Sequence, residues 1–314
     1  MPNLQKEPQI IQSHRENYLP AIRFFTKRAS SSILLARFSR FVNKSLYHLG
    51  IGCGLNRYAN CFSLYSSHAD QKLYKNYPMG SIFCNFGSGA FFHNKWKNYD
   101  YPGQSKYYQA IQGKEGDDFI GIDLCAGDLS IPEKDKSVSL IYCSHTLEHL
   151  EEAASRKFIG ECLRILEPNG VMRVALPNTS SDFEMLGLIE RQSNISSDTK
   201  QALRLAAAVQ VLNDTKSDLT NDKIEELIVN SKYSAKNFFS TAVSEGVSNK
   251  FIGSNPERHI CFWDYEELLS VSLELGFKFC MPFYQGSSIA KPFTNLNVFD
   301  NSEPHISFYA EFVK

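Results

Sequence analysis

The stretch Ser137–Pro177, SVSLIYCSHTLEHLEEAASRKFIGECLRILEPNGVMRVALP, decides the fold. Its first part, Ser137–Cys143, is short, mostly apolar and rich in strand formers, which is typical of a buried parallel strand. From Glu151 the apolar residues recur with the period of a helix, and Pro168-Asn169-Gly170 ends that helix. Either Asn169 or Gly170 suits a left-handed turn. Val171–Leu176 predicts the next strand, so the stretch predicts a βαβ unit with a right-handed crossover.

Polar residues follow the first strand of this unit at once. They are Ser144, His145, Thr146, Glu148 and His149. In an open α/β sheet, ligands bind beyond the carboxyl ends of the strands. We therefore expect a functional site where these residues lie.

Four segments carry a resemblance to a known family: Ile131-Pro132, Ser144-His145, Leu147–Leu150 and Arg164–Gly170. In this order they resemble the middle of the class I S-adenosylmethionine-dependent methyltransferases, in the type 11-like group with Leu-Glu-His after strand four. The resemblance implies an enzyme with S-adenosyl-L-methionine as cofactor. It also implies an α/β fold: a Rossmann-like, doubly wound, seven-stranded, mostly parallel sheet whose last strand is antiparallel.

The composition excludes several classes of protein. The chain has 314 residues, is 43% hydrophobic and has a net charge of −1, so no basic field indicates a nucleic-acid partner. It lacks an apolar run of about 18 residues, and we expect no membrane span. The N-terminus lacks the pattern of a signal peptide. The eight cysteines include no Cys-x-x-Cys pair, so we expect no zinc and a cytoplasmic location.

The order of segments predicts four parts. Residues 1–79 form a helical N-terminal extension, 80–178 the cofactor-binding half of the core, 179–256 a helical insertion or lid, and 257–314 the rest of the core. The extension is basic between residues 15 and 44. Its charges are either those of a solvated helical cap or a peripheral contact with anionic lipid or an acidic partner. The basic residues are Arg15, Arg23, Lys27, Arg28, Arg37, Arg40 and Lys44.

Two glycine-rich segments compete for the cofactor loop. Leu49–Gly54 follows a helical pattern, so we interpret it as a glycine turn between helices. Ile82–Gly89 is an apolar run that leads directly into Gly87-Ser88-Gly89, the strand-to-loop context in which a glycine pair has meaning. In the resembling family this loop passes under the methionine and ribose portions of the cofactor. The candidate binding residues are Asn85, Gly87, Ser88 and Gly89.

Acidic residues supply the other cofactor contacts that the resemblance implies. Trp96–Asp100 resembles the family's Gly-Trp-x-Asn-x-Asp, which makes Asp100 the candidate for the ribose hydroxyls. Phe119–Leu124 predicts strand three. Asp123 and Asp128 are both candidates for the adenine amino group, and the spacing does not choose between them. A shifted alignment would make Asp123 the ribose acid. Ser144 is a further binding candidate.

Two histidines are candidate catalytic residues. His145 lies just past strand four, where it would either act as a base towards the acceptor or only shape the loop. His259 lies where the insertion rejoins the core, and would either line the acceptor pocket or make a structural hydrogen bond. His145, Glu148 and His149 have the order His-x-x-Glu-His of one class of zinc proteases. Because they follow a strand inside a βαβ unit, we expect no metal.

The remaining elements are read from periodicity. Helices are predicted from Ser181-Asp182, over Thr199–Leu212 and over Lys223–Ser231, and another closes at Leu275-Gly276-Phe277. Ile306–Val313 alternates like an edge strand.

The sequence thus predicts methyl transfer to oxygen or nitrogen of a small molecule or a saccharide, glycan-type acceptor. The alternative is a binding or scaffold protein that kept the fold and lost turnover. A nicotinamide-dependent enzyme needs Gly-x-Gly-x-x-Gly, and the last position is Phe92 here. The oligomeric state is not predicted.

Overall fold

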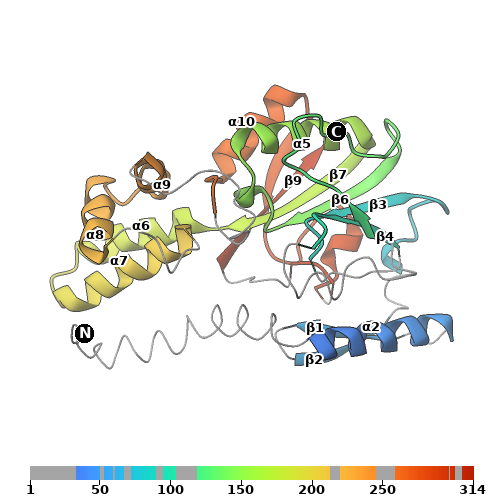
Figure 1. Ribbon diagram of the computed structural model, residues 1–314, viewed down its shortest axis with the longest axis horizontal. Helices are drawn as coiled ribbons and strands as arrows, with labels where there is room; N and C mark the ends of the chain where they lie inside the picture. The colour runs from blue at the N-terminus through green and yellow to red at the C-terminus, as the bar shows by residue number, and fades with distance from the viewer. Residues whose placement is uncertain are drawn as a thin grey trace.

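A seven-stranded sheet forms the centre of the computed structural model (Figure 1). The structure describes residues 33–49, 53–58, 61–66, 72–89, 95–103, 119–212, 220–244, 259–296, 298–300 and 306–314. The strands of the sheet are β3 Ile82–Phe86, β4 Trp96–Asp100, β5 Phe119–Gly121, β6 Val138–Ser144, β7 Leu166–Pro177, β8 Phe279–Phe283 and β9 Ser307–Val313. Their order is β5-β4-β3-β6-β7-β9-β8.

The strand directions confirm the predicted fold class. Strands β3 to β7 pair in parallel, whereas β9 is antiparallel to both β7 and β8. One prediction is wrong: β9 is not an edge strand, because it lies between β7 and β8 with both sides hydrogen-bonded. The chain order reverses between β3 and β6, which is the switch point where open α/β sheets bind ligands.

Helices α5 (Glu152–Ile165) and α10 (Tyr265–Leu275) cover one face of the sheet. Their apolar stripes, including Phe158, Cys162 and Leu268, join the largest buried cluster. The opposite face is packed with aromatic rings, among them Trp96, Phe293 and Phe299. The short 3-10 helix η2 (Lys291–Thr294) contributes to this second layer. Both faces are therefore buried, which explains why the central strands are continuous apolar runs.

The connection after α5 settles an open choice. The helix ends at Ile165 and β7 starts at Leu166. Asn169 adopts the left-handed conformation with φ of 63°, and Gly170 does not. Gly170 is needed for another reason, because a Cβ there would lie 2.9 Å from the carbonyl oxygen of Glu167.

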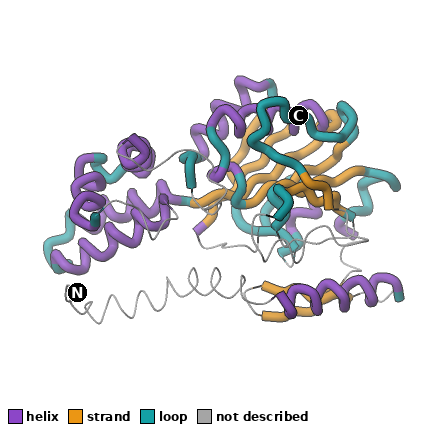
Figure 2. Tube along the Cα trace, viewed as in Figure 1, coloured by secondary structure: helices purple, strands orange, loops and turns teal. Residues whose placement is uncertain are grey.

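The insertion is a helical bundle with its own core. It contains α6 (Thr179–Glu190), α7 (Ser197–Leu212), α8 (Asn221–Asn230) and α9 (Ala235–Ser244), and the sequence analysis did not predict α9. Phe183, Ile228 and Phe238 belong to a buried cluster separate from that of the sheet. Figure 2 shows these helices projecting from the end of β7, to one side of the sheet. The exact domain boundaries stay predictions.

The described part of the N-terminal extension is not helical throughout, contrary to the prediction. Helix α2 (Ile33–His48) precedes β1 (Cys53–Tyr58) and β2 (Cys61–Ser66), which pair antiparallel in a separate two-stranded sheet. Gly54 lies within β1, so a strand follows the glycines of residues 49–54, and their interpretation as a turn between two helices is wrong. They do not follow a strand of the main sheet. Residues 1–32, which hold most of the basic segment, lie outside the described residues.

Candidate cofactor and acceptor site

The predicted glycine loop and the predicted ribose acid meet at the carboxyl ends of β3 and β4. Gly87 and Gly89 follow β3 with φ of 64° and 53°, a conformation that favours glycine. The backbone N–H of Gly89 donates to Oδ2 of Asp100 at 2.7 Å, and the N–H of Ser88 donates to the carbonyl of Tyr99 at 3.2 Å. Direct hydrogen bonds therefore join the glycine turn to the end of β4, a contact that the sequence alone did not show.

Gly87 also touches the loop that follows β6. A Cβ on this residue would lie 1.9 Å from Oγ1 of Thr146, a separation that no real contact allows. The hydroxyl of Thr146 is fixed in turn, because it donates to the carbonyl of Ser144 at 3.1 Å. The ends of β3, β4 and β6 thus meet at the glycine turn, and we call this junction the cradle. Such a cradle fits a nucleoside cofactor, which needs close approach of the chain.

Asp100 is held rigidly in this cradle. Its carboxylate is buried, with Oδ2 accepting from Gly89 and Oδ1 accepting from the N–H of Tyr101 at 2.7 Å. A carboxylate oxygen can accept more than one hydrogen bond, so these backbone contacts orient the group. The geometry fits the predicted role towards two ribose hydroxyls.

The other predicted binding residues occupy different places. Asn85 is buried within β3, where its side-chain amide donates to Oδ1 of Asn98 at 3.4 Å. Ser144 is the last residue of β6. Asp123 and Asp128 are exposed beyond the end of β5, and Oδ1 of Asp123 accepts from the N–H of Cys125 at 2.9 Å. The N–H of Ile122, the residue before Asp123, donates to the carbonyl of Asp100 at 2.9 Å. All four assignments stay predictions.

His145 stands at the exit of β6 in an uncommon conformation. Its φ is 48°, and its N–H donates to the carbonyl of Ala175 at 2.8 Å. Its Nε2 lies 2.8 Å from Oγ of Ser307, and its Nδ1 lies 3.1 Å from Oε1 of Glu148. A side chain larger than glycine at positive φ costs roughly 1–2 kcal/mol, and such strain gathers at functional sites.

A second cluster lies beside His145. Glu148 and His149 belong to the 3-10 helix η1 (Leu147–His149), and His259 comes from the segment that rejoins the core after the insertion. One ligand-type atom from each of these three side chains lies within 4.8 Å of the others. The sequence analysis selected His259 for the acceptor pocket and expected no metal at Glu148 and His149. Backbone hydrogen bonds from Ile260 and Cys261 to Glu148 bring these residues together, and no local sequence pattern indicates that pairing.

The pKa values of Glu148 and His259 are both lowered in this cluster. Burial acts to raise the pKa of Glu148, but the interaction with His145 and the charges of the three histidines lower that pKa to about 2. Burial, followed by the charge of His149, lowers the pKa of His259 to about 3. At neutral pH, Glu148 is therefore ionised and His259 is uncharged. An anionic carboxylate inside a buried pocket is an uncommon feature of a structural loop.

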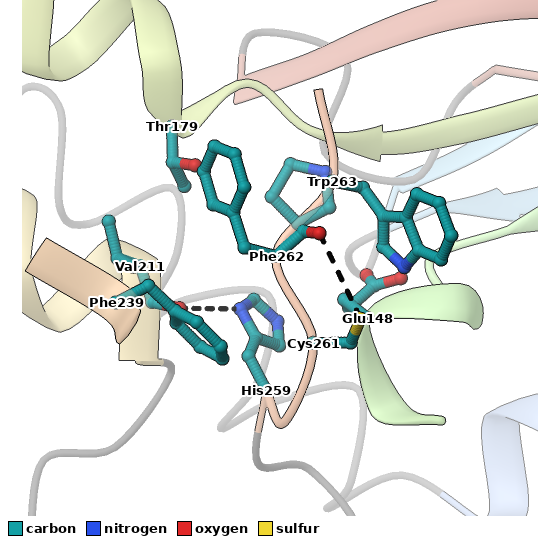
Figure 3. A pocket seen from close by; sticks show the side chains of 9 residues that line it. Glu148, Thr179, Val211, Phe239, His259, Cys261, Phe262 and Trp263 are labelled. Carbon is teal, nitrogen blue, oxygen red and sulfur yellow. Dashed lines mark hydrogen bonds between the residues drawn. The ribbon is translucent and has the colours of Figure 1, made fainter. Parts of the chain in front are cut away.

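A narrow pocket opens over this cluster, between the sheet and the insertion (Figure 3). Trp263 anchors one wall, since its indole N–H donates to the carbonyl of Leu147 at 3.2 Å. The sequence analysis missed the aromatic wall, whose only sequence signal is the Phe262-Trp263 pair next to His259. The lining residues are Glu148, Pro177, Thr179, Val211, Phe239, His259, Cys261, Phe262 and Trp263.

Comparison with known proteins bears on the central part of the chain. Residues 102–174 match the model of a family described as a methyltransferase domain. No curated protein matches the chain. The matched residues include β5, β6, α5 and the polar loop after β6, whereas Gly87 and Asp100 precede them.

Several solved structures are similar in part. A SAM-dependent methyltransferase from Archaeoglobus fulgidus has 12% identity and a TM-score of 0.37, over 78% of this chain and 92% of that one. One from Aquifex aeolicus has 9% identity and a TM-score of 0.32, over 77% and 88%. Phosphoethanolamine N-methyltransferase 2 from Haemonchus contortus, in complex with S-adenosyl-L-methionine, has 10% identity and a TM-score of 0.35, over 78% and 51%. These scores are low, so the fold assignment rests on the observed sheet order.

The family match and the sheet agree with one another and with the resemblance of the sequence segments. The matched residues supply the central βαβ unit, and the strand order with one antiparallel strand is the one that the resemblance implied. Residues 102–174 therefore match a methyltransferase domain, and the sheet that contains them has the strand order expected from the resemblance to the class I S-adenosylmethionine-dependent methyltransferases.

Proposed function

We propose that this protein transfers a methyl group to oxygen or nitrogen of a small molecule or a glycan-type acceptor. The observation that carries the proposal is the junction of three strand ends. The backbone of Gly89 is bonded to Asp100, and Gly87 packs against Thr146 at the exit of β6. The cofactor when bound supplies a methyl group on a positively charged sulfur, which is already activated towards a nucleophile.

The residues of the chain then have positioning roles. Asp100 accepts hydrogen bonds from the ribose hydroxyls. The backbone of residues 87–89, with glycine at two of its three positions, lets the nucleoside approach the chain closely. Either Asp123 or Asp128 accepts from the adenine amino group, and Asn85 and Ser144 border the same strand ends. Holding acceptor and donor in line can lower the barrier by roughly 7–11 kcal/mol without a covalent intermediate. A site with no nucleophile of its own is sufficient for this chemistry.

The acceptor side of the site is the pocket next to the insertion. In this proposal His145, at the exit of β6, takes a proton from an acceptor hydroxyl or amine, and His259 lines the pocket wall. Its aromatic residues Phe239, Phe262 and Trp263 suit a ring or saccharide face. Residues 179–256 act as the lid that excludes water and sets acceptor specificity.

The test begins with cofactor binding. Calorimetry with S-adenosyl-L-methionine should give one site per chain, and Asp100→Asn should weaken it. Release of S-adenosylhomocysteine is then measured with panels of hydroxyl, amine and saccharide acceptors. Folded protein that fails to bind millimolar cofactor would contradict the proposal. Tight cofactor binding with no turnover on any panel would favour the alternative of a binding or scaffold protein that kept the fold.

The N-terminal extension is the part of the chain that we expect to contact a membrane surface or an acidic partner. Among the described residues, no helix has the length and apolar character needed to cross a lipid bilayer. Helix α2 exposes Leu34, Phe38 and Phe41 together with basic residues. A peripheral contact of residues 15–44 with an anionic surface stays a prediction, as do the cytoplasmic location and the absence of a nucleic-acid partner.

A further inference from the structure

Glu148, His149 and His259 meet where the insertion rejoins the core, although His259 is distant from the other two in the chain. The carbonyl of Glu148 accepts from the N–H groups of Ile260 at 2.8 Å and Cys261 at 3.1 Å. This pairing fixes the register between the two segments. The rings of His149 and His259 consequently lie edge to face, with centroids 5.1 Å apart. The three side chains are thus brought together by backbone that is itself held in place.

The carboxylate of Glu148 is incompletely satisfied. Its side chain is 3% exposed, and neither of its oxygens accepts a hydrogen bond of good geometry. Two histidines face Oε1, with Nδ1 of His145 at 3.1 Å and Nε2 of His149 at 3.9 Å. Buried carboxylates in native proteins are normally hydrogen-bonded, paired or bound to a metal, so an orphaned oxygen that lines a pocket needs a partner.

His259 has the orientation of a metal ligand with its outer partner in place. Its Nδ1 lies 3.1 Å from the carbonyl of Val211, and a carbonyl can only accept, so Nδ1 carries the hydrogen. The other ring nitrogen, Nε2, is then the one with a free lone pair. Figure 3 shows the ring between Val211 and Glu148. A metal-bound histidine nearly always donates its second N–H in this way, which fixes the ring.

From this geometry we propose that Glu148, His149 and His259 bind one divalent transition-metal cation, with Zn²⁺ or Co²⁺ as the fitting class. Two imidazole nitrogens and one carboxylate oxygen form the donor set of three-ligand zinc sites that keep a fourth position open. Magnesium and calcium prefer sets made of oxygen alone. His145 is a positioning residue, because its Nδ1 lies 3.1 Å from Oε1 of Glu148. The expectation of no metal, based on the sequence, is a prediction from which this proposal departs.

The size of the site agrees with a single ion. The enclosed part of the pocket accommodates about one water-sized occupant. Ligands at about 2.1 Å from a tetrahedral ion lie about 3.4 Å from one another. The present span of up to 4.8 Å therefore requires the side chains to close by as much as about 1.4 Å, through side-chain rotation. Of the cysteines, Cys261 lines the pocket, but its Sγ faces the carbonyl of Phe262 at 3.8 Å.

The open position faces the acceptor pocket. If the proposed function holds, on which this step rests, the fourth ligand is an oxygen of the acceptor, and the favoured acceptor is a hydroxyl compound. A cation lowers the pKa of a bound hydroxyl and orients it, so the attacking oxygen would be both placed and activated. The metal site itself requires only the three side chains.

The experiment uses the full chain, freed of metal with a chelator. Zn²⁺ is titrated by calorimetry, and Co²⁺ is followed by its visible d–d absorption. We expect one ion per chain and a spectrum of four-coordinate nitrogen and oxygen ligands. The variants His259→Ala and Glu148→Gln should each weaken Zn²⁺ binding about 100-fold, judged from the effect of weaker perturbations. Glu151→Gln is the matched control, because it makes the same change on an exposed residue nearby and should leave the affinity unchanged.

Three results would overturn the metal proposal. They are no binding of Zn²⁺ to the folded chain, an unchanged affinity in Glu148→Gln, and a cobalt spectrum dominated by thiolate charge transfer, which would assign the ion to a cysteine. Binding of S-adenosyl-L-methionine is measured on the same samples. Loss of cofactor binding with metal binding intact refutes the proposed function alone, and the converse refutes the metal site alone. Circular dichroism of each variant confirms that it is folded.

Discussion

Gly87→Ala is the substitution that probes the cradle most directly. The new Cβ would lie 1.9 Å from Oγ1, 2.8 Å from Cγ2 and 2.9 Å from Cβ of Thr146, and the backbone has a φ of 64°. An alanine in the left-handed region costs roughly 1–2 kcal/mol. Forcing apart a packed contact costs roughly 1–3 kcal/mol more. We therefore expect the free energy of unfolding to fall by about 2–5 kcal/mol.

Gly80→Ala separates the two costs. Gly80 also has a positive φ of 93°, but a Cβ there meets no atom within 4 Å. This control should lose only the backbone cost of about 1–2 kcal/mol. The change in the unfolded chain is the same in both variants and cancels in the comparison. The difference between them then measures the contact of residue 87 with Thr146.

Urea denaturation followed by circular dichroism gives both stabilities, and calorimetry gives the affinity for S-adenosyl-L-methionine. Gly87→Ala should weaken cofactor binding at least about 10-fold, judged from the 1.4 kcal/mol that a decade represents, while Gly80→Ala should not change it. In a double-mutant cycle, Thr146→Ala should recover part of the lost stability, since it removes the two atoms Oγ1 and Cγ2. If Gly87→Ala costs no more than Gly80→Ala, the contact with Thr146 is not as described and the reasoning fails.

Three further outcomes are expected. Asp100→Asn should weaken cofactor binding about 10- to 100-fold in calorimetry, because hydrogen bonds to a charged acceptor contribute roughly 1.5–3 kcal/mol. Arg173→Met should lower the free energy of unfolding in urea by about 3–5 kcal/mol, since it strands the buried carboxylates of Asp300 and Glu311, which Arg173 meets at 2.5 and 2.6 Å. Asp182→Asn should stabilise the fold by about 2 kcal/mol above pH 6, because burial raises the pKa of Asp182 from 3.8 to about 6. The folded chain binds the proton of Asp182 more tightly than the unfolded chain does, so the stability of the wild type falls as the pH rises from about 4 to about 6. Urea titrations should therefore show that the advantage of the variant vanishes as the pH is lowered to about 4.

Each of these predictions has a matched control. Asp135→Asn changes an exposed aspartate and should leave cofactor affinity as it is. Arg156→Met removes the exposed ion pairs with Glu152 and Glu274 and should cost less than about 1 kcal/mol. Asp198→Asn, on an exposed helix turn, should show no pH-dependent gain. A cost for Arg156→Met equal to that of Arg173→Met would contradict the argument from burial, and a constant gain across pH would contradict the assignment to Asp182.

The sheet and the glycine turn after β3 could be predicted because their signals are local, whereas the binding roles assigned to that turn and to Asp100 stay predictions. The strand before Gly87-Ser88-Gly89, the strand ending at Asp100 and the βαβ unit each carry their own periodicity and punctuation. The stop at Leu275-Gly276 shows the same logic: Gly276 takes φ of 104° and closes α10, while Asp264 caps its start by accepting from Glu267. Each of these choices depends on a few neighbouring residues, so one sequence contains the information.

The errors concern relations between distant segments. Alternation in residues 306–313 indicates a strand but not its neighbours, so the position of β9 between β7 and β8 required the assembled sheet. The hairpin β1–β2 depends on pairing of two short segments with no strong pattern of their own. Helix α9 is stabilised by packing of Phe238 and Ala242 within the insertion rather than by its sequence alone.

By itself, the sequence determined the class of fold and the glycine turn after β3, because backbone conformation and strand periodicity depend on a few neighbouring residues. Only the tertiary structure decided that Gly87 rests on Thr146 and that His259 lies beside Glu148 and His149. The physical reason is that these contacts depend on where the chain returns after the helical insertion. Backbone hydrogen bonds from Ile260 and Cys261 to Glu148 fix that return, and no local pattern encodes it.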